Sequence, residues 1–451
     1  MESSILFSLF VTLLFFTSST TSTSNPCDVS FLKSDPSDLS VIHVYGRCSP
    51  FFIAPKTSSG WIDTVMNMAS KDPQRVTYLS SLVATKGPKP ISLPIASGQS
   101  FNIGNYIVKA KIGTPPQVMF MVLDTSNNAA WVPCSGCTGC TSTTLFTPNA
   151  SSTYGSVDCT LPECSQVRGQ SCPSNEIGVT AQCSFNQSYG GDSSFSAALS
   201  RDSLALASDI IPNYAFGCVN AVSGKSVPPQ GLLGLGRGPM SLMSQSGSLY
   251  SGVFSYCLPS FKSYYFSGSL KLGPVGQPKS IRTTPLLQNP RRPSLYYVNL
   301  TGISVGKVLV PIAPELLAFD QSSGAGTIID SGTVITRFVP SVYEAVRNEF
   351  RKQVGASAFS SLGAFDTCFM AINGDVGPTI TFHFTGLDLA LPQENSLIHS
   401  SSGSLACLAM AAAPNNVNSV LNVIANLQQQ NLRILFDTAN SLVGIARENC
   451  N

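Results

Sequence analysis

The feature that most constrains this 451-residue chain is a short pattern that occurs once in each half. The run "VMFMVLDTS" carries an apolar segment directly into Asp124, and "AGTIIDSGT" does the same at Asp330. A carboxylate that ends a buried strand is desolvated, which raises its pKa unless donors or charges compensate. The repeated pattern therefore predicts two similar lobes, each contributing one carboxylate at a strand-to-loop transition to a single site between them.

Two carboxylates in one site can act together as an acid and a base. Two acids held close together cannot both stay ionised, so they share a proton and offer a base and an acid at the same pH. The ionised member can take a proton from a water molecule held between them while the protonated member hydrogen-bonds to a carbonyl oxygen. Water would then attack a peptide bond without a covalent intermediate. Small residues after each aspartate let backbone N–H groups approach the carboxylates, and the Thr125 and Ser331 hydroxyls can tie one loop to the other.

Composition bounds the class of protein. Hydrophobic residues make up 43% of the chain, which supplies core material for two lobes of ordinary size. Charged residues make up 11% and the formal net charge is +2, so the chain lacks the dense basic surface that nucleic acids or anionic membranes require. We expect a globular, monomeric protein without a nucleic-acid partner.

The N-terminus resembles a secretory signal. An apolar run from Ile5 to Phe16 precedes a Ser/Thr-rich tract, and we assign residues 1–24 to a signal peptide. The run is shorter than the ~20 residues of a spanning helix, which disfavours the alternative of a retained membrane anchor. Fourteen cysteines fit disulfides in an oxidising compartment, and N-x-[ST] sequons predict glycosylation at Asn149, Asn186 and Asn299. We expect secretion to the apoplast or cell wall, and favour the vacuole or chloroplast less.

A candidate pro-segment follows at residues 25–90. In "DPQRVTYLSSLV", Asp72 and Pro73 read as N-cap and first helical residue, and Val76, Leu79 and Val83 recur at helical spacing. The next stretch, "TKGPKPISLPIASGQ", breaks the periodicity with three prolines, so we expect processing within residues 84–104.

The remaining sequence has the texture of a mainly β protein. In "NYIVKAKIG", Val108, Ala110 and Ile112 alternate with residues of a largely wet face, as in a half-buried strand. The run "LYYVNLTGISVGKVLVPI" also has strand character. One clear helix, "PSVYEAVRNEFRKQV", shows Ser341 and Glu344 at the spacing of a capping box. We assign residues 101–280 to an N-terminal lobe and residues 281–451 to a C-terminal lobe.

Several segments together resemble the pepsin-type aspartic proteases, specifically their cysteine-rich plant nepenthesin-like branch. These segments are "VLDTSNNAAWVPC", "QSYGGDS", "GLLGLGRGPMSL", "IIDSGT" and "NVIANLQQQNLRILFDTANSLVGIA". The resemblance runs from about residue 101 to the C-terminus. It implies a bilobal β fold with pseudo-twofold symmetry, with the catalytic pair Asp124 and Asp330 at the floor of a cleft between the lobes, and no cofactor or metal.

The resemblance also assigns residues around a peptide substrate. Tyr189 matches the tyrosine of a flap hairpin that closes over substrate, and Trp131 matches the aromatic residue that hydrogen-bonds to it; the alternative is ordinary packing aromatics. The remaining substrate-binding positions are Thr125, Ser126, Gly332 and Thr333. The implied activity is an endopeptidase with an acidic pH optimum that cleaves between bulky apolar residues.

The sequence departs from the family pattern at three places. The first motif reads Asp-Thr-Ser, followed by Asn127 where a serine usually hydrogen-bonds to the carboxylate. The flap reads Gly-Gly-Asp after Tyr189. Ala425 stands where glycine is common, although the matching segment of the first lobe keeps Gly234. We expect these departures to affect rate and pH optimum before activity itself.

The cysteines admit two readings. Cys134, Cys137 and Cys140 form a C-x₂-C-x₂-C pattern that could bind zinc, but the secretory signal favours disulfides, and His43, His383 and His399 show no ligand spacing. Spacing alone does not give the connectivity. The resemblance implies the pairs Cys134–Cys137, Cys140–Cys218, Cys159–Cys183, Cys164–Cys172, Cys257–Cys450 and Cys368–Cys407, with Cys27 and Cys48 left to pair with each other.

Three functional classes follow. The first is the secreted endopeptidase. The second is a binding module on the same fold, like plant relatives that lost the carboxylate pair and inhibit wall-degrading enzymes; retention of Asp124 and Asp330 disfavours it. The third is a chloroplast DNA-binding protease, which would need a basic surface where "NPRRPS" supplies a single arginine pair.

Overall fold

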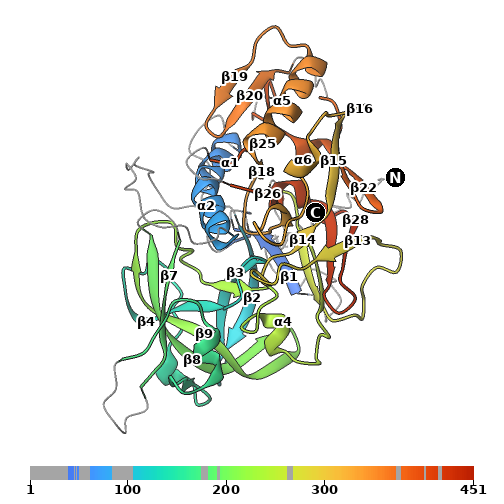
Figure 1. Cartoon of the computed structure of the whole chain (residues 1–451). Coiled ribbons are helices and arrows are strands. Elements are labelled where there is room, and N and C mark those ends of the chain that lie inside the picture. The colour runs from blue at the N-terminus through green and yellow to red at the C-terminus, as the bar shows by residue number, and fades with distance from the viewer. Residues whose placement is uncertain are drawn as a thin grey trace, which may run out of the picture.

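The computed structural model describes residues 39–44, 46, 48–49, 61–83, 105–173, 181–189, 193–261, 268–371, 377–400, 403–414 and 419–450. These residues form two β-rich lobes, seen below and above the two blue helices in Figure 1. The expected mainly β, bilobal architecture is confirmed. The predicted signal peptide and the processing region 84–104 lie outside the described residues. No helix among those residues is long and apolar enough to cross a membrane.

The first lobe is built from strands that alternate buried and exposed residues. In β2, Lys109 and Lys111 are exposed as expected, but Ile107 is buried. Ile107 is buried because it packs in a hydrophobic cluster with Ile62, Val65 and Val334. The strands are β2 (Tyr106–Ile112), β3 (Gln117–Asp124), β4 (Trp131–Thr138), β5 (Gly155–Ser156), β6 (Gln170–Ser171), β7 (Ser184–Ser188), β8 (Ser194–Leu206), β9 (Asp209–Ser223) and β10 (Leu232–Gly234), with short helices α3 (Pro162–Gln166) and α4 (Leu242–Gln245).

The second lobe repeats this arrangement with two additional sheets, β16-β15-β21-β22 and β19-β20-β24-β23. The predicted strand run that begins at Leu295 is strand-rich but divides into three strands, β14, β15 and β16. The strands of this lobe are β14 (Tyr297–Val298), β15 (Leu300–Val305), β16 (Val308–Leu309), β17 (Gly326–Ile329), β18 (Thr336–Phe338), β19 (Ser360–Leu362), β20 (Phe365–Met370), β21 (Ile380–Phe384), β22 (Leu387–Ala390), β23 (Leu397–His399), β24 (Leu405–Leu408), β25 (Met410–Ala412) and β26 (Leu421–Ile424), with the short helix α6 (Gln393–Ser396).

The predicted long helix is present as α5 (Pro340–Val354), but its predicted capping box is wrong. The N-cap is Val339, without a side-chain cap hydrogen bond, so Ser341 lies inside the helix. Pro340 at the first position sets the start, because its missing N–H is not needed there. The apolar face buries Val342, Val346 and Phe350, and Gly355 ends the helix in the left-handed conformation.

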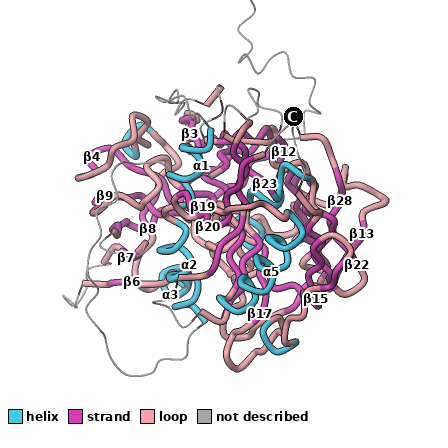
Figure 2. The backbone as a smooth tube through the Cα atoms, turned by 90° about the horizontal axis from the view of Figure 1, so that it is seen from above, coloured by secondary structure: helices cyan, strands magenta, loops and turns pink. Residues whose placement is uncertain are grey.

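Two helices of the N-terminal segment, α1 (Trp61–Ala69) and α2 (Asp72–Val83), lie between the lobes (Figure 1). Figure 2 shows them from above, between strands β4, β8 and β9 on one side and α5 with β15 on the other. Ile62 and Val65 of α1 pack against the C-terminal lobe, in a cluster with Phe365 and Ile398. The helices thus fill the space between the lobes.

A strand of the same N-terminal segment completes the central sheet. β1 (Leu39–His43) pairs antiparallel with β2 and, on its other edge, with β12 (Gly268–Leu272). Beyond it follow β11 (Val253–Cys257), β27 (Leu432–Asp437), β28 (Leu442–Arg447) and β13 (Arg282–Leu287). Among the strand pairs of the described residues, β1 alone joins β2 to β12. It places Ile42 beside Ile107 and His43 beside Tyr106, and the rings of His43 and Tyr106 meet edge-to-face.

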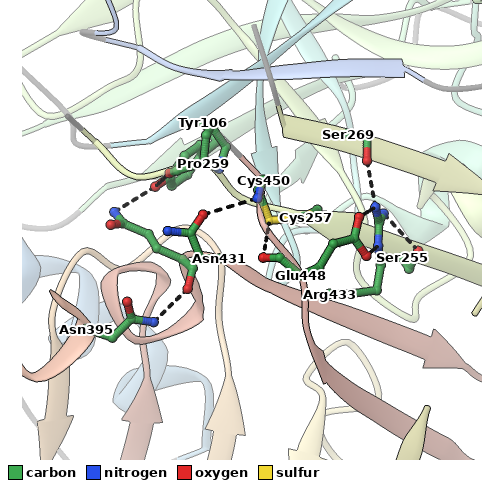
Figure 3. Close-up of a disulfide and its surroundings, with 11 residues drawn as sticks. Tyr106, Ser255, Cys257, Pro259, Ser269, Asn395, Asn431, Arg433, Glu448 and Cys450 are labelled. Carbon is green, nitrogen blue, oxygen red and sulfur yellow. Dashed lines mark hydrogen bonds and ion pairs between the residues drawn. A yellow bond between two sulfur atoms is a disulfide. The ribbon is translucent and has the colours of Figure 1, made fainter. Parts of the chain in front are cut away.

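The end of the chain is tied to this central sheet (Figure 3). Cys450 is disulfide-bonded to Cys257 of β11, as expected. The buried Arg433 of β27 is paired with Glu448 and donates hydrogen bonds to Ser255 and Ser269. A buried guanidinium needs this set of acceptors, because an unpaired charge would be strongly destabilising there.

Candidate active site

Asp124 and Asp330 occupy equivalent positions in the two lobes. Asp124 ends β3, which runs parallel to β10 with Asp124 opposite Gly234. Asp330 directly follows β17, which runs parallel to β26 in the same way. Both carboxylates are completely buried. The apolar strands that the sequence showed before each aspartate therefore carry both side chains into the interior, where the two lobes meet.

Each carboxylate receives hydrogen bonds from the loop that follows it. The backbone N–H of Ser126 donates to Asp124 at 2.9 Å, and the N–H of Gly332 donates to Asp330 at 3.1 Å. The third residue after each aspartate adds a side-chain donor, the Asn127 amide at 2.7 Å and the Thr333 hydroxyl at 2.5 Å. Asp124 alone of the pair gains a further donor, the Ser126 hydroxyl at 2.9 Å, because Gly332 has no side chain.

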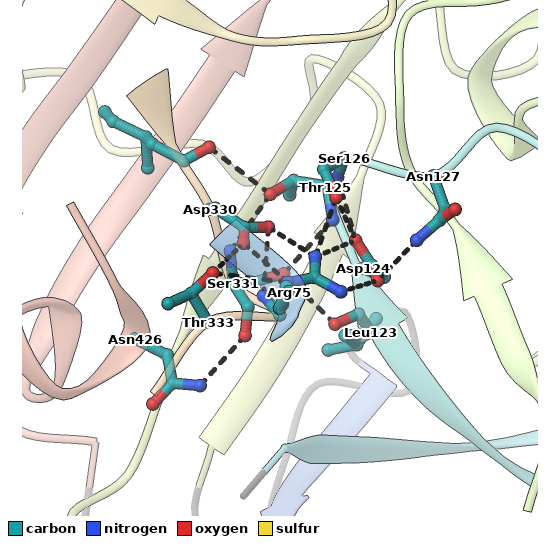
Figure 4. Close-up of polar contacts among 12 residues, drawn as sticks. Arg75, Leu123, Asp124, Thr125, Ser126, Asn127, Asp330, Ser331, Thr333 and Asn426 are labelled. Carbon is teal, nitrogen blue, oxygen red and sulfur yellow. Dashed lines mark hydrogen bonds and ion pairs between the residues drawn. The ribbon is translucent and has the colours of Figure 1, made fainter. Parts of the chain in front are cut away.

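Hydroxyl groups hold the two loops together, as the sequence predicted (Figure 4). The N–H of Ser331 donates to the Thr125 hydroxyl at 3.0 Å, and the N–H of Thr125 donates to the Ser331 hydroxyl at 3.2 Å. The Ser331 hydroxyl in turn donates to the Leu123 carbonyl oxygen at 3.1 Å. These bonds hold the two aspartates near each other, because each joins the backbone of one loop to a hydroxyl of the other.

A side chain that the sequence reasoning missed lies between the carboxylates. Arg75 of α2 donates from Nη1 and Nη2 to the two oxygens of Asp124, at 2.9 and 2.8 Å. The same guanidinium donates from Nε and Nη2 to the two oxygens of Asp330, both at 2.9 Å. Figure 4 shows Arg75 at the centre of this network. A bidentate guanidinium is the strongest partner that a protein offers to a carboxylate.

The charge of Arg75 changes the electrostatics of the site. Burial alone would raise the pKa of Asp124, but the Arg75 charge and the hydrogen bonds from Arg75, Ser126 and Asn127 outweigh it and hold that pKa below its usual range. In this arrangement Asp124 is ionised and paired.

Asp72, one helical turn before Arg75, anchors the helix. Its carboxylate is buried and accepts the backbone N–H groups of Val334 and Ile335 at 2.9 and 2.8 Å. The expectation that Asp72 caps its own helix is therefore wrong. The partners of its carboxylate belong to the loop after Asp330. Burial raises the pKa of Asp72 to about 6, against the opposing effects of the Arg337 charge and the two N–H groups.

Similarity to known proteins agrees with this geometry. Two protein-family profiles match the chain, described as Xylanase inhibitor N-terminal over residues 106–274 and Xylanase inhibitor C-terminal over residues 295–447. The chain is 65% identical over 452 residues to aspartyl protease AED3 of Arabidopsis thaliana, covering 100% of each. It is 34% identical over 374 residues to aspartic proteinase nepenthesin-1 of Nepenthes gracilis, covering 81% of each.

The chain belongs to the plant pepsin-like aspartic proteases. A third relative, aspartyl protease 25 of Oryza sativa subsp. japonica, is 54% identical over 405 residues, which is 86% of this chain and 91% of that protein. Solved structures share the fold: basic 7S globulin from soybean aligns with a TM-score of 0.60 at 22% identity, over 76% of this chain and 93% of that one. As a member of this family, the chain is an aspartic-type endopeptidase.

The segment that the resemblance assigns to a flap is the hairpin of β7 and β8. Tyr189 lies at the end of β7 and meets Trp131 edge-to-face, with ring centroids 6.1 Å apart. Trp131 Nε1 and the Tyr189 hydroxyl, the two groups that the expected hydrogen bond would join, are both buried. Helix α2 contacts the loop after β9, where the Ser226 hydroxyl donates to Gln74 at 2.9 Å. Tyr78 of α2 also lines one pocket with Gln187 and Tyr189 of the hairpin. The expected departure at the flap tip, residues 190–192, lies outside the described residues.

The structure shows the surroundings of two of the family departures, Asn127 and Ala425, and of Gly234, which keeps the family residue. Gly234 is required because a Cβ there would lie 2.1 Å from the main-chain oxygen of Asn128. Ala425 follows β26 at the equivalent position of the other lobe and is buried. Asn127 still donates to Asp124, as the amide chemistry allowed.

Four of the expected disulfide pairings are wrong. The structure joins Cys134 to Cys218 and Cys137 to Cys140, and it joins Cys159 to Cys172 and Cys164 to Cys183. Cys134 lies in β4, which runs parallel to the part of β9 that carries Cys218, so strand pairing selects this partner. The pairs Cys257–Cys450 and Cys368–Cys407 are confirmed. Cys48 is also disulfide-bonded, to a partner outside the described residues.

The sequence contained a weak signal for Arg75. A basic residue on an amphipathic helix ahead of a protease domain is a reasonable partner for a buried acid pair. Lys71 and Arg75 lie one turn apart in the same helical region, so the helical pattern does not distinguish them. The choice depends on how α2 is oriented in the cleft.

Proposed function

We propose that this chain is the inhibited precursor of a secreted aspartic endopeptidase, in which residues 25–90 act as a removable pro-segment. One observation carries the proposal. A single nitrogen, Arg75 Nη2, lies within 2.9 Å of an oxygen of each carboxylate. A water oxygen fits the same position once the helix has left, and both carboxylates would then contact it.

The hydrogen bonds divide the roles of the two acids. Asp124 has more loop donors than Asp330, because Ser126 offers both its N–H and its hydroxyl. Donors stabilise the ionised form, so Asp124 is the base that accepts the proton of the attacking water. Asp330 then holds the shared proton and donates it toward the carbonyl oxygen of the peptide bond. The pair retains one proton in acid, which supports an acidic pH optimum.

The surface under α2 supports a preference for bulky apolar substrate residues. Val76 and Leu79 of α2 are completely buried against the C-terminal lobe. Their neighbours include Leu295, Ile328 and Val423. Departure of α2 would expose this apolar surface beside the carboxylates, where substrate side chains can replace it.

The proposed location, glycosylation and disulfides are those of a protein of the secretory pathway. We propose secretion to the apoplast or cell wall after removal of residues 1–24, and a monomeric mature enzyme that binds protein or peptide substrates rather than nucleic acid. Asn149 and Asn186 are exposed and Asn299 is partly exposed, which supports glycosylation at all three. The six disulfides between described cysteines suit an oxidising compartment.

The test is hydrolysis of a denatured protein by the processed enzyme between strongly acidic and neutral pH. We expect cleavage in acid that Asp124→Asn and Asp330→Asn each abolish while leaving secretion and thermal stability near those of the parent. Absence of cleavage at every pH would favour the binding module instead. Mass spectrometry of the released peptides then identifies the residues on either side of each cleaved bond.

A further inference from the structure

The flap strand β7 directs one polar side chain toward the catalytic carboxylates. Successive residues of a strand point to opposite faces, so Phe185, Gln187 and Tyr189 share one face. Phe185 and Tyr189 contact Phe195 in an aromatic cluster that includes Trp131. Gln187 lies between these two aromatic residues in the sequence, on the face that turns toward the site.

Gln187 reaches Asp124 through Asn127. The Gln187 Nε2 group donates to Asn127 Oδ1 at 3.1 Å, and Asn127 Nδ2 donates to Asp124 Oδ2 at 2.7 Å. Asn127 is buried, so its amide has no free choice of partners. Since Gln187 offers a donor to the oxygen end of the Asn127 amide, the nitrogen end has to face the carboxylate.

We propose that Gln187 is a positioning residue of the reaction, because it orients the Asn127 amide so that the amide donates to Asp124. The inference deepens the proposed function and rests on it. Gln187 holds the oxygen end of the Asn127 amide, so that the nitrogen end donates to Asp124. Without the Gln187 donor, the Asn127 amide is free to turn and present its oxygen, which cannot donate to the carboxylate.

The other carboxylate lacks this connection. Thr333 occupies the position equivalent to Asn127, and its hydroxyl donates to Asp330 at 2.5 Å. In the described residues, the group that donates to the Thr333 hydroxyl is Arg75 Nε at 3.2 Å, from α2 rather than from the flap. Loss of Gln187 would therefore change the hydrogen bonding of one acid and not of the other, which reinforces the division into base and acid.

The pKa of Asp124 depends on the ionisable groups that face it. Asp330 faces it from the second lobe, Arg75 and Tyr78 from α2, and Tyr189 from the flap. Processing removes Arg75 and Tyr78, so Asp330 and Tyr189 remain as the neighbours of Asp124 in the mature enzyme. Asn127 and Gln187 carry no charge and act only through their hydrogen bonds.

The experiment compares mature enzymes made from the full chain with a recognition site for an added protease placed within residues 84–104. Asn127→Leu, Gln187→Leu and the double variant are measured by kcat against pH, with Ser184→Ala on the opposite face of β7 as the matched control. Loss of a donor to the ionised form raises the pKa of Asp124. We expect the acid limb of the kcat profile to move up by roughly 0.5–1 pH unit in each single variant. The double variant should move no further than Asn127→Leu alone, because both changes break one relay.

A second readout does not depend on activity. Carboxyl ¹³C NMR of aspartate-labelled mature protein, assigned with Asp124→Asn, should show the same non-additive shift. A shift caused by Asn127→Leu but absent in Gln187→Leu overturns the relay, and so do two shifts that add in the double variant. If no variant or parent cleaves any protein, the proposed function fails while the NMR titration still judges the relay. Asn127→Ala replaces the leucine variant if the latter does not fold.

Discussion

Asp72 and Arg75 lie one helical turn apart on α2, and their side chains bind the same loop of the C-terminal lobe. Arg75 pairs with Asp330, and Asp72 accepts the backbone N–H groups of Val334 and Ile335 a few residues later. The Arg75 guanidinium neutralises the buried carboxylates of Asp124 and Asp330, and the Asp72 carboxylate anchors the helix to the loop after Asp330. The two contacts depend on pH in opposite directions, and this opposition can be measured.

Replacing Arg75 by methionine should release the helix. The two buried carboxylates would lose a bidentate partner, while the apolar stem that packs in the cleft is largely kept. We expect precursor conversion at mildly acidic pH to accelerate on the order of 10-fold or more, consistent with the loss of charge-assisted hydrogen bonds. Gel analysis of conversion over time measures this. Lys71→Met is the matched control, because Lys71 donates to neither carboxylate; equal acceleration in both variants would contradict the role of Arg75.

Replacing Asp72 by asparagine should make the rate of precursor conversion rise more sharply as the pH falls. The docked helix raises the pKa of Asp72 from 3.8 to about 6, with Arg337 and Arg75 as its charged neighbours. Asp72 therefore stabilises the docked state of the helix by an amount that is fully present below pH 3.8 and is lost as the pH rises through 6. The pair of Arg75 with Asp124 has the opposite sign, because a lowered pKa gives stability that is lost as pH falls.

Wild-type Asp72 therefore opposes helix release between pH 6 and 4, and Asp72→Asn removes that opposition. We expect the conversion rate of the variant to rise more sharply over this interval than that of the parent. Stopped conversion assays at half-unit pH steps give the two slopes. Parallel slopes would mean that Asp72 does not take up a proton on docking.

Replacing Thr125 by valine should loosen the join between the lobes. The N–H of Ser331 would lose its acceptor in a buried place, which costs about 1–3 kcal/mol of unfolding free energy. We expect the thermal midpoint to fall on the order of 5 °C, with a decrease in kcat. Thr301→Val is the control, because its hydrogen bond to the His383 carbonyl oxygen is exposed. Scanning calorimetry of the mature enzyme at one fixed pH is the measurement.

Removing the disulfide between Cys257 and Cys450 should destabilise the central sheet without touching the catalytic loops. The bridge spans 193 residues, and closing so long a loop restricts the unfolded chain. We expect the double serine variant to lose about 2–5 kcal/mol of stability while its kcat stays near that of the parent. Denaturant unfolding compared with steady-state kinetics checks this. A proportional fall of kcat and stability would indicate that this disulfide also positions Asp124 and Asp330.

Local sequence contained a large part of the fold and of the site. The alternation in 106–112, the helical face of α5 and the apolar runs before both aspartates follow from periodicities of two and 3.6 residues, which depend on near neighbours alone. The hydroxyl ties between Thr125 and Ser331 could also be anticipated, because a two-lobed site has to join its two loops.

The amino-acid sequence by itself thus determined many of the strands and the position of the two acids at the ends of equivalent strands, since these rest on residue type and spacing along the chain. Tertiary structure alone decided that Arg75 rather than Lys71 meets the acids, that Asp72 binds the opposite loop, that Cys134 pairs with Cys218, and that Gln187 reaches Asn127. Each of these contacts joins residues many positions apart. Their partners are selected by the orientation of packed elements in space, which no local pattern encodes.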